Sequence, residues 1–150
     1  MDAYLNERGG LPDPETDSQF YSGVPSKRFA AFVIDMVAVM AISIAICIAT
    51  IGVGFFLFAL VYFITDAVYR IWSISSRSAT PGMRVLKIEL RNRAGDRFDT
   101  GQAVFHTILF YLSIYSGIIH LISVIMMVGS SMGRGLHDLP LGSAMINAPE

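Results

Sequence analysis

Hydrophobic positions dominate one long stretch of the chain, from Phe29 to Ile74, which is about 46 residues with few interruptions. A helix needs about 20 apolar residues to cross a bilayer, so this stretch is long enough for two crossings. Residues 50–54, Thr-Ile-Gly-Val-Gly, form the one plausible reversal within it. The pattern therefore predicts a hairpin of two transmembrane helices, over about 28–49 and about 53–74.

A third apolar stretch runs from Ala103 to Val128, about 26 residues with Gly117 near its middle. It fits one long, tilted helix that ends outside, or two half-length segments broken near Gly117 that return the chain. Length favours the single helix, because two segments of about 13 residues cannot each span. On a straight helix His106 and His120 would share a face but lie about 21 Å apart, so one metal ion could not bridge them.

Residues 75–102 are polar and carry six cations against three acids. Because short loops rich in Lys and Arg stay in the cytoplasm, we expect this loop and the N-terminus on the cytoplasmic side. Apolar and polar residues alternate over 85–91, which predicts a short strand or a hairpin between the second and third apolar segments.

The first 27 residues combine glycine, proline and small polar residues without apolar periodicity. We expect a disordered polar tail over 1–27, followed by a membrane domain over 28–147.

Composition supports an all-α integral membrane protein. Of the 150 residues, 53% are hydrophobic and 15% are charged, and the charges are nearly absent from 36–65 and 103–133. No basic arm with interleaved aromatic residues suggests a nucleic-acid partner. No nucleophile with a supporting triad, and no His and Cys set of zinc type, is visible in the sequence. We therefore expect no enzyme activity, no cofactor and no metal.

Two carboxylates fall inside the predicted transmembrane helices. Asp35 follows Arg28 by seven residues, so the two side chains share a face about 10 Å apart. Asp66 lies at a similar depth in the second helix, and paired carboxylates could handle an ion or a proton. The simpler interpretation is structural, with Asp66 and Arg70 as an i,i+4 ion pair and Arg28 bound to Asp35 or Asp138. Structural pairing is the interpretation that we favour.

Three motifs, at these spacings and in this order, resemble the RDD family of bacterial integral membrane proteins. They are Arg28-x-x-Ala31-x-x-Ile34-Asp35, Thr80-Pro81-Gly82-Met83-Arg84-Val85-Leu86 and Leu136-His137-Asp138-Leu139-x-x-Gly142-Ser143. The family is named after one arginine and two aspartates, which correspond here to Arg28, Asp35 and Asp138.

The chain also departs from the family pattern. Ser78 replaces a glycine after the second helix and Met83 replaces a lysine, while His106 stands where members often have an arginine. Leu139 and Ser143 replace a basic residue and a threonine in the closing motif. If a basic cluster binds an anion in other members of the family, this chain has fewer of the basic residues of that cluster.

The resemblance implies a multi-pass protein of the bacterial inner membrane that takes part in transport of an unidentified small ligand or ion. Cation/proton exchange is the most specific form of transport that the resemblance suggests. The alternative is a non-transporting accessory or assembly subunit whose intramembrane charges dock helices. Three apolar segments are few for a monomeric carrier, so besides the lipid bilayer we expect a homo-oligomer or a partner membrane subunit.

Overall fold

The predicted helical hairpin is confirmed. The computed structural model describes residues 10–148, and in it α2 (Val24–Ala49) and α3 (Phe58–Arg77) run antiparallel. Both helices are long and apolar enough to cross a membrane. They are joined at the predicted reversal through η2 (Val53–Leu57), where Ile51 and Gly52 adopt positive φ angles and Ile51 is 94% exposed.

A stripe of mostly small residues faces the interior along α2. Its members recur every fourth position: Ala31, Asp35, Val39, Ser43 and Cys47. Small residues let neighbouring backbones approach closely, which suits helix contact in a bilayer. Many of the other side chains of α2 and α3 are apolar and exposed, as expected for a surface that lipid covers.

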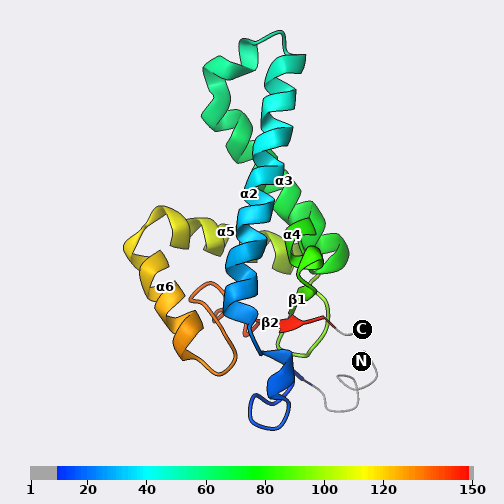
Figure 1. Cartoon of the computed structure of the whole chain (residues 1–150), viewed down its shortest axis with the longest axis vertical. Coiled ribbons are helices and arrows are strands. Elements are labelled where there is room, and N and C mark those ends of the chain that lie inside the picture. Colours follow the sequence, from blue (N-terminus) through cyan, green and yellow to red (C-terminus); the bar gives the residue numbers. More distant parts are fainter. Residues whose placement is uncertain (1–9, 149–150) are drawn as a thin grey trace.

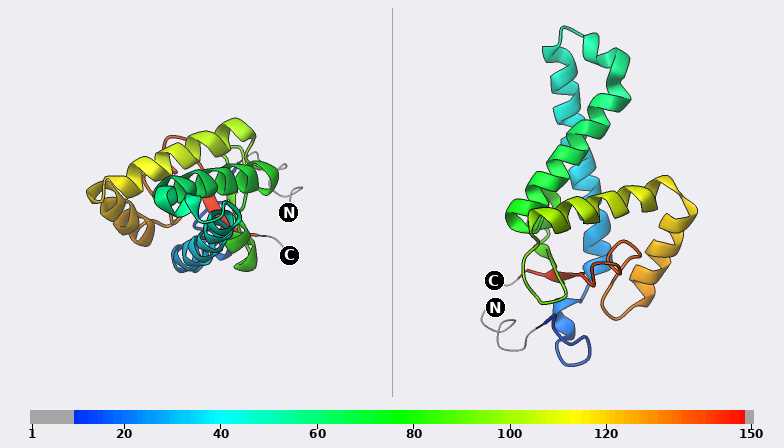
Figure 2. Two further views of the ribbon diagram at one scale, coloured as in Figure 1. Left: turned by 90° about the horizontal axis from the view of Figure 1, so that it is seen from above. Right: turned by 180° about the vertical axis from the view of Figure 1, so that it is seen from behind.

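The third apolar segment is broken. α5 (Thr100–Tyr115) and α6 (Ile118–Gly129) meet at Gly117 and are bent by 112°. The Gly117 backbone has φ 60° and ψ −63°, a conformation that favours glycine. The single helix that length favoured is therefore not formed, and α6 turns back toward the end of the molecule where α2 begins (Figure 2).

A two-stranded antiparallel sheet ties the C-terminal segment to the loop after α3. β1 (Ile88–Arg91) is the predicted strand, and it follows the short helix α4 (Pro81–Val85). Its partner is β2 (Ala144–Asn147), with Leu90 opposite Met145, so the pairing is long-range rather than a local hairpin. The C-terminal segment therefore lies beside residues 75–102.

The described part of the predicted tail is packed. Residues 18–20 form the short helix η1 (Ser18–Phe20), and the hydroxyl of Tyr21 donates to the Pro12 carbonyl at 2.7 Å. Tyr21 packs with Ala144 and Ile146 of β2, and α2 already begins at Val24. The disorder expected over 1–27 is thus not seen in residues 10–27, while residues 1–9 of that prediction lie outside the described residues.

The main hydrophobic cluster gathers at one end of the hairpin. It joins α2, α4, β1 and β2 through residues that include Val24, Met83, Leu90 and Met145. Figure 1 shows the outer half of the hairpin projecting away from this cluster.

Candidate functional site

Asp138 forms the centre of a buried polar network. Its carboxylate is fully buried and accepts a hydrogen bond from the Arg28 guanidinium, Nη1 to Oδ2, at 2.7 Å. The backbone N–H of Gly135 donates to the same oxygen at 2.9 Å. The turn over 135–138 therefore aims the carboxylate at α2, across 110 positions of sequence.

Two histidines complete this network. Nε2 of His106 lies 3.1 Å from Asp138 Oδ1, and Nε2 of His137 lies 2.9 Å from Arg28 Nη2. Arginine can only donate, so Nε2 of His137 accepts, and the His106 Nε2–H donates to the carboxylate. Nδ1 of each ring is buried, and neither has a hydrogen-bond partner within residues 10–148.

The charges of the network follow from its burial and its partners. Burial opposes ionisation of Asp138, but the Arg28 guanidinium and the hydrogen bond from His106 outweigh this effect. They hold the pKa of the Asp138 carboxyl well below its usual range. Burial lowers the pKa of His137 to about 3, despite the nearby Asp138 carboxylate. The network at neutral pH is therefore an arginine–aspartate ion pair flanked by a neutral His137.

Asp35 lies in a different environment from Asp138. Its side chain is 1% exposed and accepts from the Tyr69 hydroxyl at 2.7 Å, from the Gly82 N–H at 2.8 Å and from the Thr80 hydroxyl. In the described part of the chain, these hydrogen-bond donors to Asp35 are two hydroxyls and one backbone amide, and none of them carries a charge. A buried carboxylate held by neutral donors alone is expensive, so it has a structural or a functional reason.

Gly82 makes this arrangement sterically possible. A Cβ at position 82 would lie 2.4 Å from the carbonyl oxygen of Ala31 and 2.8 Å from Oδ1 of Asp35. Thr80 caps α4 by accepting from the Met83 N–H at 3.3 Å, and it binds Asp35 through the same hydroxyl. The Thr-Pro-Gly motif therefore docks the start of α4 directly onto α2.

Asp66 and Arg70 form the i,i+4 pair within α3. Nε of Arg70 lies 2.9 Å and 3.1 Å from the two carboxylate oxygens, and the Tyr111 hydroxyl donates to Oδ2 at 2.6 Å. The guanidinium carbon also lies 4.6 Å from the ring centroid of Phe110, within cation–π range. These contacts link α3 to α5.

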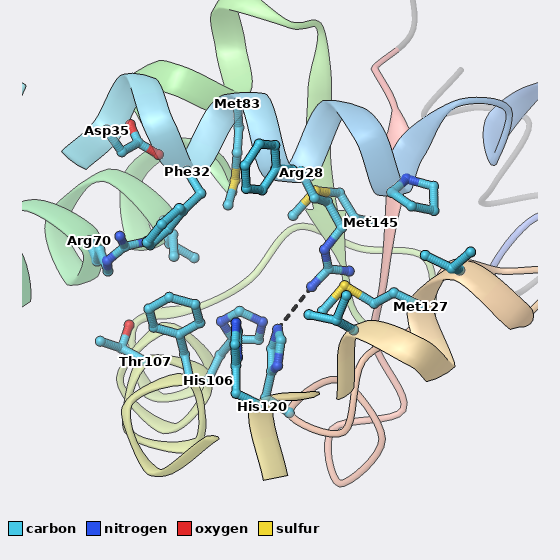
Figure 3. A pocket seen from close by; sticks show the side chains of 17 residues that line it. Arg28, Phe32, Asp35, Arg70, Met83, His106, Thr107, His120, Met127 and Met145 are labelled. Carbon is cyan, nitrogen blue, oxygen red and sulfur yellow. Dashed lines mark hydrogen bonds between the residues drawn. The ribbon is translucent and has the colours of Figure 1, made fainter. Parts of the chain in front are cut away.

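A cavity of about 190 Å³ lies between these groups (Figure 3). It is lined from α2, α3, α4, α5 and α6, from the 134–143 segment and from β2. Its lining combines paired charges, histidines, aromatic rings and thioethers, namely Arg28, Phe32, Asp35, Arg70, Met83, His106, Phe110, His120, Met127, His137 and Met145. Phe29 and Val128, which are 70% and 72% exposed, lie at the rim, so the cavity reaches the surface between α2 and α6.

The structure brings together some of the residues selected from sequence and separates others. Arg28 pairs with Asp138 and not with Asp35. Asp35 and Asp66 share no hydrogen-bond partner within the described residues, so no common hydrogen-bonding group links the two carboxylates. The roles of Asp35 and Asp66 in ion or proton handling stay predictions.

The three histidines were missed as a group. The bend at Gly117 folds α6 back, so His106 and His120 line one cavity although a straight helix would separate them. His137 and Asp138 lie in a turn, and both reach Arg28. The substitution of a usual family arginine by His106 was the one sequence signal that could have pointed here.

Two histidines and an aspartate also have the composition of a metal site. Within the described residues, one ligand atom each from His106, His137 and Asp138 lie within 4.8 Å of one another. The Arg28 guanidinium already contacts both His137 and Asp138, and its charge opposes a divalent ion at that position. This trio fits an ion-pair network better than a divalent metal site.

Comparison with known proteins agrees with the motifs. A model of the RDD family matches residues 23–142, which covers the hairpin, the broken third segment and the turn that carries Asp138. No curated protein and no solved structure gives a match.

Proposed function

Because this chain belongs to the RDD family, we propose that it takes part in membrane transport as a cation/proton exchange module. The cavity between α2, α5 and α6 is the proposed binding site, with Asp35 as the group that handles the ion or proton. We place the protein in the bacterial inner membrane as a multi-pass protein with a cytoplasmic N-terminus, because the polar 75–102 loop is rich in cations.

The observation that carries this proposal is the surplus of acid around the cavity. Arg28 and Arg70 are each neutralised by an aspartate, Asp138 and Asp66. Asp35 faces the same cavity and has no such partner among the described residues, so the formal balance is negative. A negative site that is shielded from water favours a cation or a proton.

One copy of the chain has few helices with which to enclose a pathway. The outer half of the α2–α3 hairpin stands apart from the other described elements (Figure 1). Transport would therefore require a second copy or a partner membrane subunit packed along that half, and a homo-oligomer is the simpler version.

Flux through reconstituted vesicles tests the proposal. Wild-type protein should move protons in response to a gradient of a monovalent cation, with Na⁺, K⁺ and Ag⁺ tested in turn, reported by a pH-sensitive dye inside the vesicles. Asp35→Asn keeps the shape of the side chain but removes its charge, and it should abolish the flux while the protein stays folded. Asp96→Asn removes one charge from an exposed turn and serves as the matched control. Absence of flux in the wild type with every cation tested would overturn the exchange activity.

The alternative is a non-transporting accessory subunit, and the ion pairs favour it. Arg28–Asp138 and Asp66–Arg70, the latter through Tyr111, join separate elements of the fold. In that case Asp35→Asn and Arg28→Gln should both lower accumulation in the membrane, and extraction in mild detergent should recover a stoichiometric partner. A wild type that transports without a partner would contradict this alternative.

A further inference from the structure

The cavity contains an unusual concentration of soft metal ligands. Three thioethers and three imidazoles line it, from Met83, Met127, Met145, His106, His120 and His137. These residues are spread over more than 60 positions of sequence and come from five parts of the fold. Figure 3 shows Met127 and Met145 extending toward the hollow that His106 and His120 also face.

Not all of these groups are occupied by internal contacts. The sulfur of Met83 accepts from the Thr80 N–H at 3.5 Å, so it serves the cap of α4. Nδ1 of His106 is buried, and no hydrogen-bond partner for it lies within residues 10–148. Since Nε2 of His106 donates to Asp138, the unpartnered Nδ1 carries a lone pair. Buried polar atoms are nearly always satisfied, so this lone pair points to a ligand.

Met127 lines the same cavity as His106 and lies next to His137. A Cβ at Gly135 would lie 2.5 Å from Cε of Met127 and 3.0 Å from Cε1 of His137, so the two side chains meet over this glycine. Met145 is 1% exposed and reaches the cavity from β2. Two thioethers and at least one free imidazole nitrogen therefore converge on one space.

The chemistry of this donor set selects a soft ion of low charge. Thioether sulfur and neutral imidazole favour Cu⁺ over hard ions such as Na⁺ or Mg²⁺. A divalent ion would be repelled more strongly than a monovalent one by the Arg28 guanidinium, which lies 2.9 Å from His137. The surplus carboxylate charge around the cavity offsets a single positive charge.

We propose that this cavity binds a soft monovalent metal cation, Cu⁺, through His106 Nδ1 and the sulfurs of Met127 and Met145, with His120 completing the coordination. The inference rests on the cation-binding role proposed above and names the class of ion.

Equilibrium binding to the full chain in detergent tests the site. Cu⁺ kept reduced by ascorbate would be titrated in competition with bicinchoninate, and Ag⁺, which is inert to redox change, would be titrated by calorimetry. Wild-type protein should retain one equivalent of either ion. A double variant, Met127→Leu with Met145→Leu, should bind at least tenfold more weakly. X-ray absorption of the Cu⁺ complex should show both sulfur and nitrogen neighbours.

Met126→Leu is the matched control, because Met126 is adjacent to Met127 on α6 but does not line the cavity. Leucine conserves the volume of methionine, so all variants should keep the wild-type circular dichroism and elution volume. Equal affinity in the double variant and the wild type, or a copper spectrum without sulfur, would overturn the site. Flux of Na⁺ or K⁺ without Ag⁺ binding would overturn the choice of ion while leaving cation exchange in place.

Discussion

At the residue scale, the buried charges of this protein divide into two kinds. Asp138 and Asp66 are each neutralised by an arginine at 2.7–2.9 Å, as expected for charges that must be removed from water. Asp35 is held by neutral donors, and this depends on the close approach of Gly82. Within residues 10–148 Asp35 accepts hydrogen bonds from neutral groups, so neutralising its side chain by substitution would break no ion pair described here.

Gly82→Ala tests this close approach. The added methyl group would meet the backbone of Ala31, which cannot move aside as a flexible side chain could. We expect the free energy of unfolding to fall by about 1–3 kcal/mol or more, measured in detergent by mixed-micelle denaturation. Gly129→Ala is the control, because a Cβ there has no atom within 4 Å, and it should change stability by less than about 1 kcal/mol.

Acid should destabilise the protein through His137 and Asp138. The pKa of His137 falls from 6.5 to about 3 on folding, so below pH 6.5 the unfolded state binds a proton that the folded state does not. The stability that comes from keeping His137 neutral is therefore fully present above pH 6.5. It declines as the pH falls toward 3, by at most about 1.4 kcal/mol per pH unit for one group. The lowered pKa of Asp138 adds a loss that begins below its unfolded value, near pH 4.

His137→Gln isolates the histidine contribution, since glutamine can still accept from Arg28 but does not titrate. The slope of the unfolding free energy against pH between 6 and 4 should become shallower, because unfolding of the variant should take up about one proton fewer than unfolding of the wild type. An unchanged slope would show that His137 is already protonated in the folded protein.

At the scale of the elements, the break at Gly117 decides which residues meet. Without the 112° bend, α6 would continue away from α2, and His120 and Met127 would leave the cavity. The long-range pairing of β1 with β2 has a similar effect, because it places Met145 beside the other thioethers. The bend at one glycine and one long-range strand pairing therefore assemble the cavity lining.

Gly117→Ala should strain this bend. An L-residue at φ 60° costs about 1–2 kcal/mol, and we expect a loss of stability of that size. The bend itself is measured with spin labels on the exposed positions Ile108 and Val128, in a Cys47→Ser background. A straight helix would separate these positions by about 30 Å, and the wild type should give a clearly shorter distance. A distance near 30 Å in the wild type would contradict the broken segment.

At the scale of the whole molecule, both ends of the described chain lie at the same end of the hairpin (Figure 2). The Lys27 ammonium donates to the Asn147 side chain at 2.6 Å, and Asn147 in turn donates to backbone carbonyls of Gln19 and Ser22. In a bilayer, the tip at Ile51 should therefore face one side, and the 75–102 loop and both described ends should face the other.

Single cysteines at Ile51, Arg93 and Pro140, in a Cys47→Ser background, test this arrangement. All three positions are exposed. In intact spheroplasts, an impermeant maleimide should label position 51. It should label positions 93 and 140 only after the membrane has been permeabilised. Labelling of 140 together with 51 would place the C-terminal segment outside and would contradict the β1–β2 sheet.

How much of the site could be predicted from sequence depended on the distance between partners. Asp66 and Arg70 are four positions apart on one helix, so helical geometry alone suggested their contact. Arg28 had two candidate partners, and no local rule could choose Asp138 at a separation of 110. That Nδ1 of His106 has no hydrogen-bond partner in the described part of the chain could not be foreseen, because burial and hydrogen bonding depend on the packed neighbours.

The sequence by itself determined the membrane hairpin, the position of its turn, the strand before residue 92 and the family motifs. These features follow from local periodicity, segment length and residue type, which act over a few turns of chain. The tertiary structure alone decided the direction of α6, the partner of β1, the pairing of Arg28 with Asp138 and the gathering of histidines and methionines around one cavity. Each of these depends on a backbone angle at one glycine, or on contacts between segments distant in sequence, and hydrophobic patterning encodes neither.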